Sequence, residues 1–159
     1  MKTIELSQGK VALVDDENFE ELSRYTWYAI RNRHRFYAVR HGKGPHYKVL
    51  SMHRQIVVPS RGLECDHINQ DGLDNRRANL RLCTDAQNSH NQRSRCGSSK
   101  FKGVTFRKDR KKWTAQITLN GKQRHLGYFL NEEDAARRYD KAACELFGDF
   151  ARPNFQDVA

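Results

Sequence analysis

Four polar residues between positions 66 and 88 have the types and spacing needed to hydrolyse a phosphodiester bond. Asp66 and His67 are adjacent, Asn79 follows twelve residues after His67, and Asn88 nine residues after that. A neutral imidazole takes a proton from water near neutral pH, so His67 is the candidate general base. Asp66 and Asn88 offer hard oxygen ligands to a divalent cation, expected to be Mg²⁺ with Mn²⁺ as the alternative. Asn79 is expected to hold the imidazole in the tautomer that accepts the proton.

The elements that must position these residues are a strand, a loop, a second strand and a helix. An apolar run ends in Asp66 and His67, and a loop rich in Asn, Asp and Gly follows. A second short strand over 80–83 leads into a polar helix that begins near residue 86. Such a unit brings the Asp-His pair close to Asn88 on the facing helix.

This pattern resembles the HNH endonuclease motif of the ββα-metal type, in the version found in phage and bacterial homing endonucleases. The loop over 71–81 is also similar to that family, and Met52-His53-Arg54 is similar to part of its upstream strands. The resemblance covers residues 1–94. It implies a metal-dependent DNA endonuclease in which Asn88 is the final metal ligand, where many HNH enzymes have His.

Positive charge favours a polyanionic partner, above all nucleic acid. The 159 residues carry a net charge of +10, and residues 25–62 contain eight Lys and Arg and no Asp or Glu. Aromatic residues interleave with these bases, which suits strands with one packed and one cationic side; a solvated strand face is the other interpretation. Short strands are predicted over 4–7, 10–14, 25–30 and 36–40. The candidate DNA contacts in this part are Arg31, Arg33, Arg35, Arg40 and Arg54.

The pattern changes beyond a polar, basic stretch at 95–100, which is typical of a linker. Three antiparallel strands are predicted over 101–107, 113–119 and 123–129. Asn120-Gly121 is a strong hairpin signal between the last two strands. Apolar residues at three- and four-residue spacing then predict an amphipathic helix with Asn131 as its N-cap, ending at Gly148.

Residues 101–155 resemble the plant ethylene-response-factor (Apetala-two) DNA-binding domain. The segments that carry the resemblance are Lys102-Gly103-Val104, Leu126-Gly127-Tyr128-Phe129, Glu133-Asp134-Ala135-Ala136, Tyr139-Asp140-Lys141-Ala142-Ala143 and Asn154-Phe155. In that family the three-stranded sheet enters the major groove, and Trp113 is expected in the core. The DNA contacts implied by the resemblance are Lys102, Thr105, Arg107, Lys112, Gln116, Thr118, Gln123 and His125. Several of these replace the family's base-reading Arg, Glu and Trp, so its GC-rich target is not implied.

These observations predict an α+β protein with an HNH domain over 1–94, a linker over 95–100 and a DNA-binding domain over 101–155. The leading hypothesis is a site-specific, homing-type endonuclease that binds double-stranded DNA and no small-molecule substrate. The alternative is a DNA-binding transcriptional regulator with an inactive nuclease module. A structural metal-binding module is a third class, and is disfavoured because Asp and Asn form a poor structural site.

The hydrophobic pattern and the cysteines indicate the cellular compartment in which the protein is expected. No apolar run approaches the length needed to cross a bilayer and no secretion signal is present, so a soluble protein in the cytoplasm of a bacterial or phage-infected cell is expected. The four Cys form no CxxC pair, which predicts reduced thiols rather than a zinc knuckle. The oligomeric state is left open, with a monomer slightly favoured.

Overall fold

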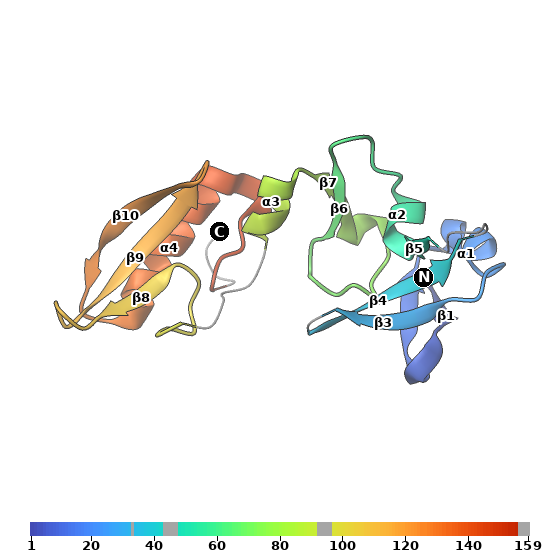
Figure 1. Cartoon of the computed structure of the whole chain (residues 1–159), viewed down its shortest axis with the longest axis horizontal. Coiled ribbons are helices and arrows are strands. Elements are labelled where there is room, and N and C mark those ends of the chain that lie inside the picture. The colour runs from blue at the N-terminus through green and yellow to red at the C-terminus, as the bar shows by residue number, and fades with distance from the viewer. Residues whose placement is uncertain (33, 43–47, 92–96, 156–159) are drawn as a thin grey trace. The chain divides into compact units, whose positions relative to one another are not determined.

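The computed structural model describes residues 1–32, 34–42, 48–91 and 97–155. The chain divides into an N-terminal unit, Met1–Asp85, and a C-terminal unit, Ala86–Ala159. Each unit combines antiparallel strands with helices (Figure 1). This confirms the predicted α+β class at the level of small antiparallel sheets and a C-terminal helix.

The N-terminal unit is built from short strands that pair in three small antiparallel sheets within its described residues, β1-β2, β3-β4-β5 and β6-β7. The strands are β1 (Lys2–Glu5), β2 (Val11–Val14), β3 (Tyr28–Asn32), β4 (Arg35–His41), β5 (Val49–Ser51), β6 (Glu64–His67) and β7 (Leu80–Cys83). The helical segments are η1 (Ser7–Gly9), α1 (Asp16–Leu22), α2 (Met52–Ile56) and η2 (Arg77–Asn79). The expected pairs of strands are therefore present, whereas α1 was not predicted.

One apolar core joins these sheets, and it determines the structure of the segment around Met52. Leu22, Trp27 and Met52 are buried there, and the Trp27 indole N–H donates to the Leu22 carbonyl over 2.8 Å. The expectation of a strand at Met52-His53-Arg54 is wrong, because these residues begin helix α2. Met52 and Ile56 lie four residues apart, so one helical turn buries both side chains in the same core.

The C-terminal unit is a three-stranded antiparallel sheet, in the order β10-β9-β8, with α4 along one face (Figure 1). Its elements are β8 (Val104–Arg107), β9 (Lys112–Leu119), β10 (Lys122–Phe129), α4 (Glu132–Phe147) and η3 (Gly148–Phe150). Ala115 and Ile117 on β9 are buried against α4, and Trp113 packs at the edge of this core. Alternate residues of β9 therefore pack against the helix, and Leu119, two residues further along the strand, is half-buried.

Helix α4 begins and ends where its sequence predicts. Asn131 is its N-cap and three acidic residues occupy the first turn, where the positive end of the helix dipole stabilises carboxylates. Gly148 follows the last helical residue with a φ of 51°. A shorter helix, α3 (Asp85–His90), starts at the boundary of the two units, and its residues from Ala86 onward group with the C-terminal unit.

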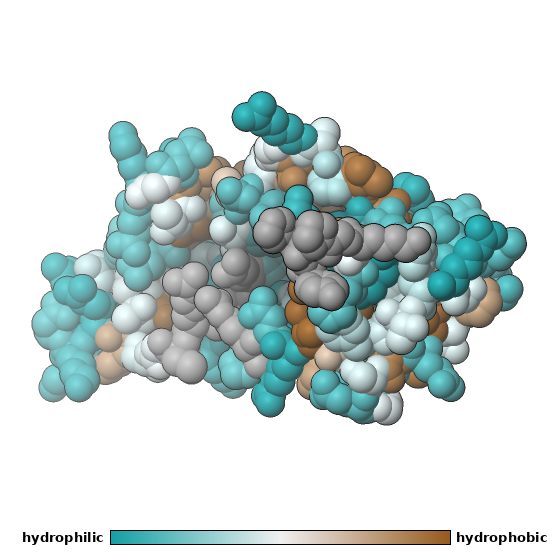
Figure 2. Space-filling model, turned by 45° about the vertical axis from the view of Figure 1, so that its right-hand side comes forward, coloured by the Kyte–Doolittle hydropathy of each residue, from teal (hydrophilic) through white to brown (hydrophobic). Residues whose placement is uncertain are grey.

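The face shown in Figure 2 is mainly hydrophilic, with small and separate apolar patches. Among the described residues, no helix is long and apolar enough to span a membrane. Cys65, Cys83 and Cys144 are free thiols, and Cys96 lies outside the described residues.

Candidate nuclease site and nucleic-acid interface

The β6-β7 pair places Asp66 and His67 at the end of a buried strand. In its antiparallel register Asp66 is opposite Arg81, and His67 is opposite Leu80. The Asp66 side chain is 7% exposed and His67 is 5% exposed. Both groups are therefore held in the interior, where charges and hydrogen bonds are less screened by water than at the surface.

The His67 imidazole has a defined tautomer. Its Nε2 lies 3.3 Å from Oδ1 of Asn75, and the Asn75 Nδ2 donates to the carbonyl of Leu73 over 3.1 Å. The bond to Leu73 fixes the orientation of the amide, so Oδ1 faces the ring and can only accept. His67 must then carry its proton on Nε2, and Nδ1 keeps the lone pair that a general base uses.

A preorganised loop holds Asn75 against the imidazole. The backbone N–H of Asn75 donates to the Leu13 carbonyl over 2.8 Å, and the Leu13 N–H donates to the Leu73 carbonyl over 2.8 Å. These bonds tie the loop to strand β2, and Asn75 is fully buried. The partner of the general base is thus positioned by a segment about sixty residues away in the sequence.

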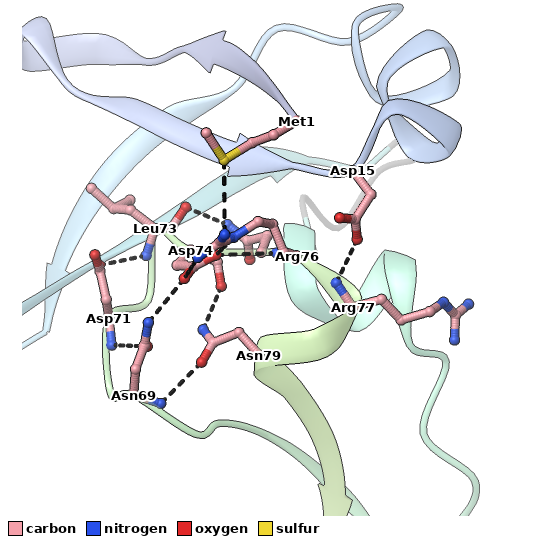
Figure 3. A network of polar contacts seen from close by, with 10 residues as sticks. Met1, Asp15, Asn69, Asp71, Leu73, Asp74, Arg76, Arg77 and Asn79 are labelled. Atoms are coloured by element: carbon pink, nitrogen blue, oxygen red, sulfur yellow. Dashed lines mark hydrogen bonds and ion pairs between the residues drawn. The ribbon is translucent and has the colours of Figure 1, made fainter.

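The centre of this loop is Asp74, which is 2% exposed (Figure 3). Its two carboxylate oxygens accept from Arg76 over 2.7 Å each, and Asn69 donates to one of them over 2.9 Å. The guanidinium of Arg76 lowers the pKa of Asp74 below its usual range. The loop therefore keeps an ionised carboxylate at its centre, neutralised by a neighbouring cation.

Asn79 closes the same loop. Its Nδ2 donates to the Asp74 carbonyl over 2.8 Å, and its Oδ1 accepts from the backbone N–H of Asn69 over 3.0 Å (Figure 3). The hydrogen bond to the imidazole that we expected from Asn79 is made by Asn75 instead. In the sequence Asn75 is one of several polar loop residues, and nothing in the pattern distinguishes it. A catalytic role for Asn79 stays a prediction. In that role Asn79 would act indirectly, by holding the loop that contains Asn75.

Burial keeps His67 neutral. The pKa of His67 is lowered below its ordinary value mainly by burial, which outweighs the opposing effects of the Asn75 hydrogen bond and the Asp66 charge. A neutral imidazole with a lone pair on Nδ1 is the state required to accept a proton from water.

A second buried histidine adjoins His67. His53, on α2, is 8% exposed, and its ring lies edge-on to the His67 ring with centroids 4.8 Å apart. The Tyr37 ring lies about 6 Å from both, at 6.0 and 5.9 Å. Burial lowers the pKa of His53 to about 3, and its buried Nδ1 has no hydrogen-bond partner among the described residues. The four-residue spacing of Met52 and Ile56 is compatible with a helix that turns His53 inward, but α2 is too short for this spacing to be distinctive.

The chemistry of the donors fits a divalent cation such as Mg²⁺, which prefers carboxylate and amide oxygens. Asp66 supplies the carboxylate, and its Oδ2 also accepts from the Arg81 guanidinium over 3.0 Å. Both side chains are largely buried. In the described part of the chain no cluster of three or more His, Cys, Asp or Glu forms a ready metal cage. Cation binding at Asp66 stays a prediction, and a cation there would have to share the carboxylate with Arg81.

The other predicted ligand, Asn88, lies on α3 in the C-terminal unit. The structure brings Asp66, His67 and Asn79 together in the N-terminal unit. Metal coordination by Asn88 stays a prediction.

The arginines predicted to contact DNA from the N-terminal unit differ in their surroundings. Arg31 is exposed on β3, and Arg33 lies outside the described residues. Arg35 donates to Gln70 in the loop after His67. Arg40 donates to Gln55 and packs over the Tyr25 ring, and Arg54 lies 3.9 Å from Glu64. DNA contact by these arginines stays a prediction.

The predicted contacts on β8, β9 and β10 share one face of the C-terminal sheet. Cross-strand neighbours point to the same side, as do residues two apart on one strand. The register pairs Thr118 with Gln123, Gln116 with His125, Thr105 with Thr114, and Arg107 with Lys112. This face is the one away from α4. Most of its predicted contact residues are exposed, with Thr105 and Gln116 half-buried.

Lys102 differs from the other predicted contacts. It precedes β8, is half-buried, and its ammonium donates to the carbonyl oxygen of His90. Burial lowers the pKa of Lys102 to about 8. Its ammonium is thus engaged inside the C-terminal unit, and a contact with DNA stays a prediction.

Comparison with known proteins finds two separate family matches along the chain. Residues 46–90 match the family model described as HNH endonuclease, and residues 99–149 match the AP2 domain model. A rice APETALA2-like protein 2 (Oryza sativa) is 36% identical over 66% of this chain, which covers 26% of the rice protein.

Two viral proteins are similar over most of their length. An uncharacterized HNH endonuclease of Acanthamoeba polyphaga mimivirus is 33% identical over 92% of this chain and 76% of its own length. Protein 3.8 of Escherichia phage T7 is 33% identical over 67% of this chain and 92% of its own length. With both domain models matched and this coverage, the chain belongs to the HNH endonuclease family and carries an AP2 domain behind its nuclease segment.

Proposed function

We propose that the protein is a site-specific DNA endonuclease of the homing type, in which His67 is the general base of a metal-dependent hydrolysis. The observation that carries this proposal is the state of the His67 imidazole. It is buried and neutral, its Nε2 proton is committed to Asn75, and Nδ1 keeps its lone pair. The family of the chain supplies the reaction class.

In this mechanism Nδ1 of His67 takes a proton from water as the water oxygen attacks phosphorus, and the 3′ oxygen leaves. The adjacent Asp66 carboxylate favours the imidazolium that forms, because an opposite charge nearby stabilises the protonated ring. Asp66 and Asn88 would hold the divalent cation, which supplies positive charge for the phosphate and the leaving oxygen. Asn75 keeps the ring in the productive tautomer throughout.

The C-terminal sheet is proposed to hold the duplex. Its face away from α4 presents amide, hydroxyl, imidazole and cationic groups, which suit both base edges and phosphates. Lys108, Arg110 and Lys111 extend the positive charge along the β8-β9 turn and are exposed. They are expected to attract phosphates without reading sequence.

The test is to incubate the purified full chain with supercoiled plasmid, with Mg²⁺ or with EDTA. Relaxed or linear products with Mg²⁺ alone support the proposal. A parallel preparation of His67→Ala controls for a contaminating nuclease. Tight DNA binding with no cleavage in the presence of Mg²⁺ or Mn²⁺ would contradict it and favour the DNA-binding regulator.

A further inference from the structure

Two other rings pack beside the His67 imidazole inside the N-terminal unit. The His53 ring lies edge-on to it, with centroids 4.8 Å apart and planes at 74°. The Tyr37 ring lies 5.9 Å from it, with planes at 60°. These separations and angles are typical of packed aromatic pairs, which favour edge-to-face arrangements. The candidate general base is therefore packed against two rigid, flat side chains.

The hydrogen bond to Asn75 and the packing of the rings restrain His67 in different ways. The bond at Nε2 selects the tautomer, but it acts on one atom at the edge of the imidazole, and at 3.3 Å it is long for a hydrogen bond. The tilt of the imidazole about this bond depends on what packs against it. Because the Nδ1 lone pair lies in the plane of the imidazole, the tilt decides where the base points.

His53 is held firmly enough to set this tilt. It lies in α2 between Met52 and Ile56, which are both buried in the core of the N-terminal unit. Its backbone carbonyl accepts from the N–H of Val57 over 2.9 Å. Its side chain is buried, so close packing restricts the rotamers that it can adopt. The ring therefore presents a fixed edge or face to His67.

Tyr37, on β4, packs against the loop that carries Asn75. A Cβ added at Gly72 in this loop would lie 2.6 Å from Cδ1 of the Tyr37 ring. The backbone of the loop thus approaches the ring as closely as only a glycine allows. The loop that positions the hydrogen-bond acceptor of His67 also restrains one of the rings beside it.

The contacts of the His53 ring, rather than a hydrogen bond at Nδ1, are what this side chain offers to His67. The buried Nδ1 has no hydrogen-bond partner among the described residues. Burial lowers the pKa of His53 to about 3, so the ring is neutral near neutral pH. A neutral ring does not repel the imidazolium that forms on His67 when it accepts a proton.

We infer that His53 is a positioning residue of the nuclease reaction, whose ring packs edge-on with His67, fixes the tilt of the imidazole and so directs Nδ1 at the reacting water. Tyr37 supports the same tilt from β4. This inference rests on the proposed function and deepens it, because it names a residue through which the packing of α2 acts on the general base.

The test compares full-length variants of His53 with a matched control. His53→Ala removes the ring, and His53→Leu fills the space without a flat edge. His53→Phe keeps a flat ring in the same place. Val57→Ala removes apolar atoms from the same core and leaves both histidines in place. Variants are compared when their circular dichroism spectrum at pH 7 is that of the wild type, so His53→Leu decides if His53→Ala does not fold.

Nitrogen NMR of the His67 side chain measures the restraint directly. In the wild type, Nε2 should have the chemical shift of a protonated nitrogen, and Nδ1 that of an unprotonated one. In His53→Ala and His53→Leu the two shifts should move toward each other. Exchange of the Nε2 proton with water should quicken about tenfold there, because a looser ring is bonded to Asn75 for less of the time. His53→Phe and Val57→Ala should match the wild type.

Cleavage should follow the same order. The single-turnover rate at saturating DNA should fall roughly tenfold to a hundredfold in His53→Ala and His53→Leu, because a misaligned base is costly. It should stay within about twofold of the wild type in His53→Phe and Val57→Ala. Wild-type rates in His53→Ala and His53→Leu would overturn the inference. A loss in His53→Phe as large as in those variants would also overturn it, and would assign the role to Nδ1.

The two measurements separate this inference from the proposed function. If the wild type fails to cleave DNA with any cation, the proposed function fails, and the nitrogen shifts still decide whether His53 holds the imidazole. If the wild type cleaves DNA, and the nitrogen shifts and cleavage rates of the His53 variants equal its own, the proposed function stands and the inference fails.

Discussion

The two units present their polar groups in opposite ways. Around His67 the polar side chains are buried, bonded to one another and shifted in pKa, whereas the outer face of the β8-β9-β10 sheet presents polar groups to solvent. Burial lets a few hydrogen bonds fix one protonation state, which catalysis requires. Exposure lets side chains adapt to a partner and exchange water for phosphate and base edges, which binding requires. The difference indicates a division of labour between chemistry and recognition.

The largest expected effect is a loss of stability in Gly103→Ala that is confined to the C-terminal unit. A Cβ at Gly103 would lie 1.9 Å from the Tyr139 ring, at a φ of +76°. The strain and the clash should cost about 4 kcal/mol. Gly121→Ala is the matched control, because its φ is +74° and nothing lies within 4 Å; it should cost only about 1 kcal/mol. Thermal unfolding of both variants checks this, and equal costs would show that Gly103 is not packed as described.

The second largest effect is a change in the Mg²⁺ dependence of cleavage, which we expect for a variant of the N-terminal unit and not for a variant of the C-terminal unit. Asp66→Ala removes the one carboxylate of the proposed cation site, so cleavage at limiting Mg²⁺ should fall roughly a hundredfold and recover in part at higher Mg²⁺. Asp109→Ala makes the same change in the exposed ion pair of the C-terminal unit and should leave the Mg²⁺ requirement unaltered. A Mg²⁺ titration of cleavage measures both. Identical titration curves for the Asp66 variant and the wild type would exclude Asp66 as a ligand.

Acid should destabilise the N-terminal unit through His53. Its folded-state pKa is about 3, and an unfolded histidine has a pKa near 6.5, so between these values the unfolded chain binds more protons. The free energy of unfolding is therefore unaffected by His53 above pH 6.5. It decreases as the pH falls below this value, by roughly 2 kcal/mol at pH 5. Urea unfolding at pH 7 and pH 5, followed by Trp27 fluorescence in a Trp113→Phe background, measures the loss. The loss should shrink in His53→Phe, and an equal loss there would assign it to another group.

The smallest effect is expected when one cationic side chain is removed from the exposed face of the C-terminal sheet. Lys112→Ala should weaken DNA binding a few-fold and reduce the slope of log affinity against log salt by about 1. The cleavage rate at saturating DNA should stay the same. Binding measured at several salt concentrations checks this, and an unaltered slope would place Lys112 away from phosphates.

Strands and the long helix were predictable because their patterns are local. The alternation along β9 and the apolar spacing of α4 follow from the period of each element alone. Asn75 was not predictable, because Asp74, Asn75 and Arg76 are all polar, and bonds to Leu13, far away in the sequence, decide which of them reaches His67. The burial of His53 depends likewise on the packing of α2, a helix too short for its period to be distinctive.

The central claim is that chemistry resides at His67 and recognition on the sheet face. The most direct test measures both the single-turnover cleavage rate at saturating DNA and the dissociation constant for two matched variants, His67→Ala and His125→Ala. His67→Ala should lose cleavage by about a hundredfold or more with affinity within about twofold of the wild type, because its imidazole acts on water. His125→Ala should bind a few-fold more weakly and cleave at the wild-type rate once saturated. Wild-type cleavage by His67→Ala, or a slowed rate at saturation in His125→Ala, would contradict this account.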